Sequence, residues 1–383
     1  MNGNLNTSRR EFLRSLGIGT TAGVVAQWSM APAFGLEPRS DQNNRLIRLD
    51  SNENAYGPSP KVLAAIHAAA ESSNRYPFAQ TDSLCECIAS FHHVRPEEIL
   101  LGCGSTEILR VAACAFLYNG KQVITASPTF EAMEQYARSA GSVAIAVPLN
   151  AAFAHDLDAM LARSDSSTGL FYICNPNNPT ASLTARRDIE HFVSKLPATT
   201  TVLIDEAYCH YVGKSGAYAS FLDHRLDDER LIVVRTFSKA YGMAGLRLGY
   251  AVGSPRKIQQ MREFNTHRNI NAIVAQAACV ALEDQASVDE FGRRNANARQ
   301  EFFNQAMARA LKPIDSHTNF VMMATSHPAN AVIDHFKKNK ILIGRAFGAM
   351  NTYIRVSLGL PGEMQAFWQA WDTLPYPKGT MHH

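Results

Sequence analysis

Between about residues 99 and 253, short apolar runs with the composition of β-strands alternate with stretches that have the composition of helices. The predicted strands are 99–101, 122–125, 143–148, 169–174, 201–205, 231–236 and 247–252. Strands that alternate with helices in this way form βαβ units, in which neighbouring strands run parallel. The pattern therefore predicts a large α/β domain with a mainly parallel sheet, and Pro255 opens a further helical stretch.

One lysine follows closely after the predicted strand 231–236. Lys239 lies in the run Thr236–Gly249, which is rich in small residues, and Arg247 comes eight positions after it. Ligands of open α/β folds bind at the carboxyl ends of the strands. An amine that is desolvated or close to another cation there has a lowered pKa and can form an imine with an aldehyde. We therefore interpret Lys239 as a Schiff-base lysine.

Two further predicted strands end in polar side chains. Asp205 is the last residue of the run 201–205, Tyr208 follows it, and Asn178 lies in the Asn- and Pro-rich turn after 169–174. If the aldehyde is pyridoxal phosphate, its ring nitrogen must stay protonated, and a carboxylate such as Asp205 can pair with it. Tyr208 and Asn178 can then reach the phenolic oxygen of the cofactor. The alternative is that Asp205 only caps the following turn.

Several segments in a fixed order carry a family resemblance. They are Leu49–Asn54 with Tyr56–Pro58, Arg75–Pro77, Gly102–Glu107, Asn175–Thr180, Thr201–Tyr208, Thr236–Gly249 and Tyr353–Gly359. From about residue 47 to about 370 the chain resembles the fold-type I pyridoxal-phosphate aminotransferases, and among them it is most similar to the histidinol-phosphate aminotransferase family. The resemblance implies an α/β fold in which a smaller α+β domain accompanies the large domain.

The resemblance also implies which residues hold the cofactor. These are Tyr76, Gly104, Ser105, Thr106, Phe130, Asn178, Asp205, Tyr208, Thr236, Ser238, Lys239 and Arg247. Backbone N–H groups at a helix N-terminus would bind the phosphate of the cofactor together with Arg247 and the hydroxyl groups. Phe130 would stack on the pyridine ring. The partner subunit of a homodimer would donate Tyr76.

Four residues are implied in substrate binding. They are Tyr56, Asn178, Arg345 and Arg355, of which Arg355 would receive a carboxylate or phosphate and Arg345 would help to hold a substrate phosphate. The chain departs from the family at Ala181, where glycine is usual, and at Phe130, where tyrosine is commoner. Both changes leave the cofactor assignment intact.

The expected activity is the ping-pong transfer of an amino group between an amino acid, or histidinol phosphate, and a 2-oxo acid. Lys239, Asp205 and Tyr208 would be the catalytic residues. A decarboxylase or lyase on the same fold is the alternative, because it would keep the same cofactor residues. A non-catalytic protein that binds pyridoxal phosphate or another ligand is a third reading, which the complete residue set disfavours.

The N-terminus has the pattern of an export signal. Arg9 and Arg10 form a twin-arginine motif, followed by a mostly apolar stretch from Leu16 to Met30 and the small-residue sequence Ala31–Ala33. We expect a Tat signal peptide, a transient contact with the Tat translocon and a periplasmic enzyme; a retained membrane anchor is the alternative. The expected organisation is a signal peptide at 1–33, an N-terminal arm and part of the small domain at 34–75, the large cofactor-binding domain at 76–285 and the C-terminal small domain at 286–383.

Charge, cysteine content and residue spacing argue against a nucleic-acid-binding protein, a disulfide scaffold and a metal-binding protein. The formal net charge of +3 falls to about +1 without the leader, which gives no reason to expect nucleic-acid binding. The seven cysteines are an odd number, so at least one thiol stays free within a monomer and the chain is not a disulfide scaffold. The cysteine and histidine spacings match no common metal motif, and we expect no metal site.

Overall fold

The computed structural model describes residues 46–213, 216–266 and 268–375, and the predicted leader at 1–33 lies outside these residues. Seven strands of the described chain form one sheet in the order β2-β8-β7-β6-β5-β3-β4. Their bounds are β2 (Ile99–Gly102), β3 (Gln122–Ser127), β4 (Ala144–Pro148), β5 (Thr168–Cys174), β6 (Thr201–Asp205), β7 (Leu231–Thr236) and β8 (Gly249–Gly253). Each lies within two residues of the strand that the sequence predicts.

The sheet is mainly parallel, as predicted. The pairs β3–β4, β3–β5, β5–β6 and β6–β7 are parallel, whereas β8 runs antiparallel to both β7 and β2. The carboxyl ends of all strands except β8 therefore meet at one edge, and β8 begins at that same edge. A residue that precedes β8 consequently lies beside residues that follow the other strands.

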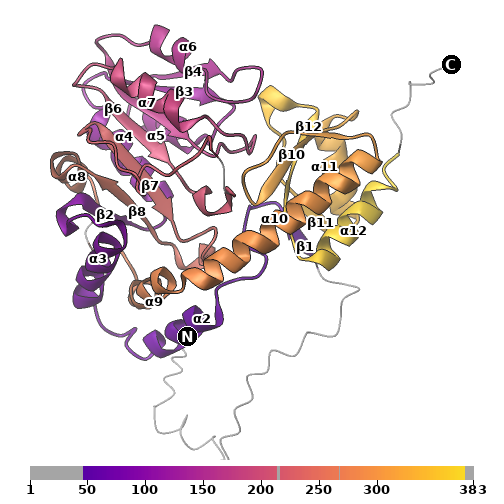
Figure 1. The fold of residues 1–383 in the computed structure, drawn as a ribbon, viewed down its shortest axis with the longest axis horizontal. Helices are drawn as coiled ribbons and strands as arrows, with labels where there is room; N and C mark the ends of the chain where they lie inside the picture. Colours follow the sequence, from indigo (N-terminus) through magenta and orange to yellow (C-terminus); the bar gives the residue numbers. More distant parts are fainter. Residues whose placement is uncertain (1–45, 214–215, 267, 376–383) are drawn as a thin grey trace, which may run out of the picture. The chain divides into compact units, whose positions relative to one another are not determined.

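Helices cover both faces of this sheet (Figure 1). The helices are α2 (Pro60–Ala70), α3 (Phe78–His92), α4 (Ser105–Phe116), α5 (Ala132–Ser139), α6 (Leu157–Ala162), α7 (Arg186–Ser194), α8 (Pro255–Arg262) and α9 (Ala272–Glu283). Helices α4, α5 and α8 share one apolar cluster, and the others pack on the opposite face. Alternate residues of β5 enter the two clusters, Phe171 on one side and Tyr172 on the other. Burial on both faces explains why the strands read as continuous apolar runs.

The C-terminal part builds a second core around two small sheets, β1–β11 and β12–β10–β9. The elements are β1 (Ile47–Leu49), α10 (Gln285–Ala308), β9 (Lys312–Pro313), β10 (Phe320–Ala324), α11 (Ala329–Lys338), β11 (Ile341–Ile343), β12 (Tyr353–Ser357) and α12 (Pro361–Trp371). Short 3-10 turns are η2 (Pro96–Glu98), η3 (Cys209–Tyr211), η4 (Ala244–Leu246) and η5 (Gly348–Met350). None of the helices in the described ranges is both long and apolar enough to span a membrane.

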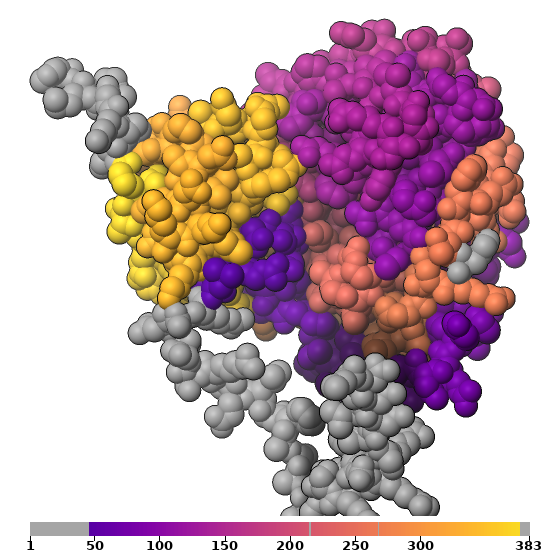
Figure 2. Space-filling model, turned by 180° about the vertical axis from the view of Figure 1, so that it is seen from behind, coloured from indigo at the N-terminus to yellow at the C-terminus, as the bar shows by residue number. Residues whose placement is uncertain are grey.

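The first described residues connect the two cores. β1 pairs in parallel with β11, and Asn54 Nδ2 then donates to the carbonyl of Ala240, 3.0 Å away. In Figure 2 this indigo segment lies between the yellow C-terminal part and the centre of the molecule. The stretch from Asp50 to Asn54 is thereby placed against the residues that follow β7.

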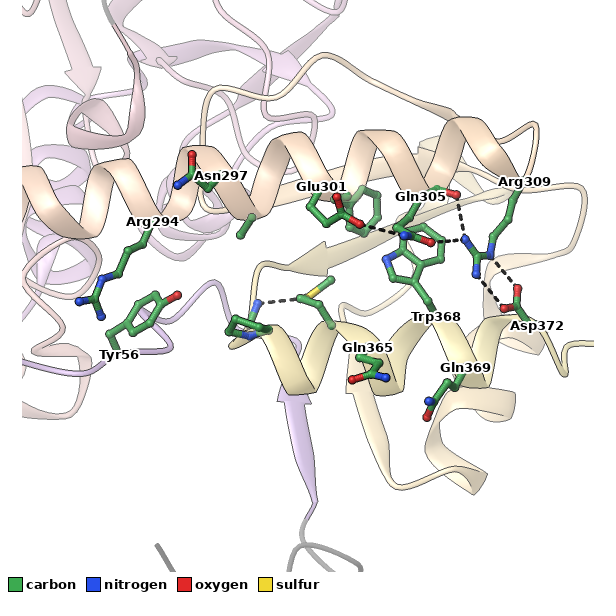
Figure 3. A pocket seen from close by; sticks show the side chains of 15 residues that line it. Tyr56, Arg294, Asn297, Glu301, Gln305, Arg309, Gln365, Trp368, Gln369 and Asp372 are labelled. Atoms are coloured by element: carbon green, nitrogen blue, oxygen red, sulfur yellow. Dashed lines mark hydrogen bonds and ion pairs between the residues drawn. The ribbon is translucent and has the colours of Figure 1, made fainter.

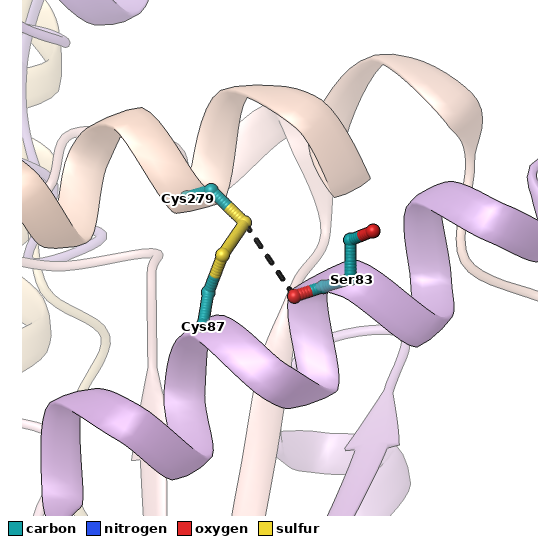
Figure 4. The surroundings of a disulfide bond; sticks show 3 residues. All are labelled: Ser83, Cys87 and Cys279. Carbon is teal, nitrogen blue, oxygen red and sulfur yellow. Dashed lines mark hydrogen bonds between the residues drawn. A yellow bond between two sulfur atoms is a disulfide. The ribbon is translucent and has the colours of Figure 1, made fainter.

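A disulfide between Cys87 of α3 and Cys279 of α9 joins segments that are 192 residues apart in the sequence (Figure 4). The Cα atoms of the two cysteines are 5.9 Å apart. The other five cysteines, all within the described ranges, are free thiols.

Candidate active site

A cavity of about 400 Å³ opens at the edge of the sheet where the strands have their carboxyl ends. Its lining comes from the turns after β2, β3, β5, β6 and β7, from the residues before β8, and from β12 and the segment after β1. The lining residues are Asp50, Ser51, Asn52, Glu53, Ser105, Thr106, Phe130, Cys174, Asn178, Asp205, Ala207, Tyr208, Thr236, Ser238, Lys239, Ala244, Arg247 and Arg355. Side chains that the sequence predicts as site residues, and that come from distant parts of the chain, thus line one cavity.

Lys239 extends into this cavity from the turn after β7. Its Nζ donates to two backbone carbonyls, Asn52 at 3.0 Å and Ser51 at 3.2 Å. Burial lowers the pKa of Lys239 from 10.5 to about 8, and the charge of Arg355 adds to the effect. At pH 7 an amine with this pKa is neutral in about one molecule in ten, several hundred times more than an ordinary lysine, and the neutral form is the nucleophile.

Asp205 lies at the end of β6 and is almost completely buried. Its Oδ2 accepts a hydrogen bond from the Tyr172 hydroxyl, 3.0 Å away, and its Oδ1 accepts one from the backbone N–H of Ala207. Burial raises the pKa of Asp205 to about 6, while these two hydrogen bonds oppose the rise. A buried carboxylate held by neutral donors in this way is suited to bind a cationic group of a ligand.

An anion cradle lies on the other side of the cavity, at the start of α4. No side chain caps this helix at Gly104, and although the N–H of Glu107 donates to the Gly104 carbonyl, the N–H groups of Ser105 and Thr106 can bind an anion. The Arg247 guanidinium lies 3.4 Å from the hydroxyl oxygens of both Thr106 and Ser238. Gly104 has a φ of +77°, and an added Cβ would collide with Nη2 of Arg247, so only glycine lets the arginine approach the helix.

These features fit pyridoxal 5′-phosphate. The cradle of Arg247 and α4 suits its phosphate, the carboxylate of Asp205 suits its protonated ring nitrogen, and Lys239 can take its aldehyde. Phe130 lines the cavity on the loop after β3. The buried Tyr208 also lines it, and the hydroxyl of Tyr208 accepts a hydrogen bond from Asn52 Nδ2 at 3.1 Å.

Arg355 of β12 also lines the cavity. One of its nitrogens donates to Asn178 Oδ1 at 2.8 Å, and another donates to the carbonyl of Asp50 at 2.7 Å. Its Nε is buried and has no hydrogen-bond partner among the described residues. Burial lowers the pKa of Arg355, and the nearby charge of Arg345 acts in the same direction. The guanidinium is therefore positioned to bind an anion that reaches into the cavity.

Three of the predicted site residues lie away from this cavity. Arg345 forms an ion pair with Glu131, and its guanidinium lies over the Phe347 ring. Tyr76 is 81% exposed on the loop between α2 and α3. Tyr56 stacks on Phe291 and lines a second cavity of about 610 Å³ between α10 and α12 (Figure 3).

Three residues to which the sequence alone assigns no role hold the side chains of the site in place. They are Tyr172, Asn52 and Asp50. Tyr172 lies in the middle of β5 and reads as an ordinary core residue, yet its hydroxyl holds Asp205. Asn52 binds Tyr208 with its side chain and Lys239 with its carbonyl. The signal for Asn52 and Asp50 was their place within the conspicuous segment Leu49–Asn54.

Comparison with known proteins identifies the family. A family model described as aminotransferase class I and II matches residues 44–369. A histidinol-phosphate aminotransferase of Methylobacillus flagellatus is 34% identical over 348 residues, covering 90% of this chain and 92% of that protein. One from Moorella thermoacetica is 32% identical, covering 85% and 84% of the two chains.

Solved structures agree with the sequence comparison. The histidinol-phosphate aminotransferase of Sinorhizobium meliloti in complex with pyridoxal 5′-phosphate superposes with a TM-score of 0.80 at 29% identity, and the match covers 85% of this chain and 89% of that one. The L-threonine-O-3-phosphate decarboxylase of Porphyromonas gingivalis has a TM-score of 0.74 at 22% identity, with 85% and 98% covered. The second likeness shows the shared fold alone.

Proposed function

Because the chain belongs to the class I and II aminotransferases, we propose that Lys239, Asp205, Arg247 and Arg355 act together to move an amino group from an anionic amino donor to a 2-oxo acid. The enzyme is a pyridoxal-phosphate-dependent aminotransferase similar to the histidinol-phosphate aminotransferases. The observation that carries the proposal is the meeting of these four side chains in one cavity.

In this proposal, Asp205 and Arg247 bind the cofactor and Lys239 transfers protons. Bound pyridoxal phosphate supplies an electron-withdrawing ring that stabilises negative charge at the substrate Cα. Asp205 would hold the proton on the ring nitrogen, and Arg247 with the N-terminus of α4 would hold the phosphate. Lys239, whose pKa is near 8, would take the proton from the substrate Cα and pass it to the cofactor.

Arg355 selects the donor. Its guanidinium is tied to Asn178 and to the Asp50 carbonyl, which fixes its plane for a carboxylate or phosphate group. The names of the closely similar relatives point to histidinol phosphate as one donor to test, and glutamate, aspartate and aromatic amino acids are the others. An exported enzyme would be separated from cytoplasmic histidine synthesis, so its donor can differ from that of the relatives.

An absorption titration of the purified holoenzyme tests the proposal. We expect one of these donors to replace the visible absorption of the Lys239-linked cofactor by the near-ultraviolet absorption of its aminated form, and a 2-oxo acid to reverse the change. Lys239→Ala should lose both the linked absorption and turnover. A cofactor spectrum that no donor converts, with release of carbon dioxide or of a side-chain group, would favour the decarboxylase or lyase reading.

We further propose that the active unit is a homodimer in which each subunit donates Tyr76 to the other's phosphate site. The support is surface character: Tyr76 and Phe78 stack on each other, and both are exposed. An exposed pair of aromatic rings favours a partner. Light scattering should give twice the monomer mass, and Tyr76→Phe should weaken cofactor binding without dissociating the dimer.

We also propose export through the Tat translocon, with the enzyme acting in the periplasm. The support is the twin-arginine sequence at Arg9 and Arg10 together with its apolar stretch. Cell fractionation should find the enzyme in the periplasm, and replacement of both arginines by lysine should leave it in the cytoplasm. An enzyme that stays with the membrane fraction after export would instead support a retained anchor.

A further inference from the structure

An ion pair outside the cavity connects the two cores of the molecule. Glu131 directly follows Phe130 and precedes α5, and Arg345 lies in the loop after β11. Arg345 Nη2 is 2.6 Å from Glu131 Oε2. The side chains are 56% and 44% exposed, so water and solutes reach both.

Arg345 is close to the substrate arginine. Its guanidinium carbon lies 4.4 Å from the centroid of the Phe347 ring, and that of Arg355 lies 5.4 Å from the same centroid. The backbone N–H of Gly344 donates to the Arg355 carbonyl at 2.8 Å, which ties the Arg345 loop to β12. The charge of Arg345 lowers the pKa of Arg355, so each guanidinium lies within the field of the other. The two guanidinium groups thus lie near the same ring, and one of them, Arg355, lines the cavity.

Glu131 neutralises the charge of Arg345. A ligand with one anionic group can bind Arg355 and leave the pair of Arg345 and Glu131 intact. Nη2 of Arg345 donates to Glu131 and Nη1 donates to the Ala346 carbonyl, so a second anionic group of a ligand has to compete with the Glu131 carboxylate for Nη2 and for the charge of Arg345. An exposed ion pair changes an equilibrium by about five-fold at most, so this competition has a small cost.

We propose that Glu131 is a specificity-determining residue that competes with the distal anionic group of the substrate for Arg345. This inference rests on the proposed function, because it takes Arg355 as the site of the first anion. The distal group is a carboxylate or a phosphate. The competition lets the enzyme accept a neutral side chain, while it limits the preference for a doubly anionic substrate.

Binding of unreactive acids to the holoenzyme tests the role of Glu131 without turnover. Glutarate carries two carboxylates, butyrate is its matched monocarboxylate, and 4-phosphonobutyrate carries a phosphonate at the distal end. We expect Glu131→Gln to tighten binding of glutarate about two- to five-fold, measured by calorimetry, and to leave butyrate unchanged. A larger gain for 4-phosphonobutyrate than for glutarate would identify a phosphate as the preferred distal group, and the reverse would identify a carboxylate.

A double-mutant cycle assigns the effect to the pair. Arg345→Gln should weaken glutarate binding, and Glu131→Gln should have no further effect in that background. Glu131→Asp, which keeps the charge on a shorter side chain, should give a smaller gain and serves if the Gln variant does not fold. An equal change for glutarate and butyrate, or a gain that persists without Arg345, overturns the proposal. Failure of every acid to bind, with no spectral conversion by any donor, would instead count against the proposed function.

Discussion

The surroundings of Asp205 act in two opposite directions on the ionisation of its carboxyl group. Burial raises the pKa of Asp205 to about 6, and the Tyr172 hydroxyl bond opposes that rise. The cofactor needs the charged form, because only a carboxylate keeps the ring nitrogen protonated. Tyr172 is therefore a positioning residue, since it keeps Asp205 ionised at neutral pH without reaching the cavity itself.

The role of Tyr172 predicts a shift in the pH dependence of cofactor binding. In the wild type, affinity for pyridoxal phosphate should fall as the pH drops through about 6, where Asp205 takes up a proton. Tyr172→Phe removes a hydrogen bond to the charged form, so this fall should begin at a higher pH, and affinity at pH 7 should drop by about ten-fold. Titration of the cofactor-free protein across pH, followed by absorbance, measures both effects.

Asp205→Asn is the matched control for this titration. It removes the titrating group, so the affinity should be low and should lose the step near pH 6, both alone and in combination with Tyr172→Phe. If Tyr172→Phe lowers affinity equally at every pH, the hydroxyl acts through packing and not through the charge of Asp205.

At the scale of elements, the strand pattern predicted which side chains lie together, because the carboxyl ends of parallel strands meet at one edge of the sheet. Asp205, Lys239 and Asn178 each come at or after the end of a parallel strand, so their meeting follows from the topology alone. The same reasoning could not place Tyr56 and Arg345. Their positions depend on how α10 and the loop after β11 pack against distant segments, and a local pattern carries no information on such contacts.

The disulfide between α3 and α9 could not be predicted from the sequence for the same reason. Nothing in the spacing of seven cysteines distinguishes Cys87 and Cys279 from Cys85, which is on the same helix as Cys87. Only the packing of α3 against α9 brings the pair together (Figure 4).

The bond should contribute to stability because it closes a long stretch of chain. A crosslink between residues 192 positions apart restricts the unfolded state, and removing a native disulfide typically costs about 2–5 kcal/mol. We expect the double variant Cys87→Ser/Cys279→Ser to unfold at a lower temperature than the oxidised wild type. Scanning calorimetry with and without a thiol reductant measures the difference.

Cys85→Ser is the matched control for the disulfide. Cys85 is a partly buried free thiol whose pKa burial raises to about 11, so it should stay reduced and unreactive. Its variant should keep the sensitivity of the wild type to reductant, whereas the double variant should lose it. A wild type whose melting temperature does not respond to reductant would contradict a stabilising bond.

At the scale of the whole molecule, the fold holds several histidines in the neutral form. Burial lowers the pKa of His92 and His210 to about 3 and that of His155 to about 4. His92 Nε2 lies 2.8 Å from the Tyr250 hydroxyl, and His155 Nδ1 lies 2.8 Å from Thr184 Oγ1. Each of these contacts engages one ring nitrogen, Nε2 of His155 has no hydrogen-bond partner among the described residues, and protonation would place a charge in the core.

This burial predicts that the protein loses stability in mild acid. Below pH 6.5 the unfolded chain protonates these three histidines while the folded chain does not, so the free energy of unfolding falls by about 1.4 kcal/mol per pH unit for each. Asp205 acts in the opposite direction below pH 6, because its pKa is raised in the fold and the folded chain takes up that proton first. For these four groups alone, the net loss between pH 6 and pH 4 should correspond to about two protons, and His317 and His327, whose pKa values burial also lowers, add to it. Urea unfolding of the cofactor-free protein at each pH measures this slope, and His155→Asn should reduce it by about one proton while keeping a polar partner for Thr184. A stability that stays constant from pH 7 to pH 5 would mean that the histidines already accept protons in the folded state.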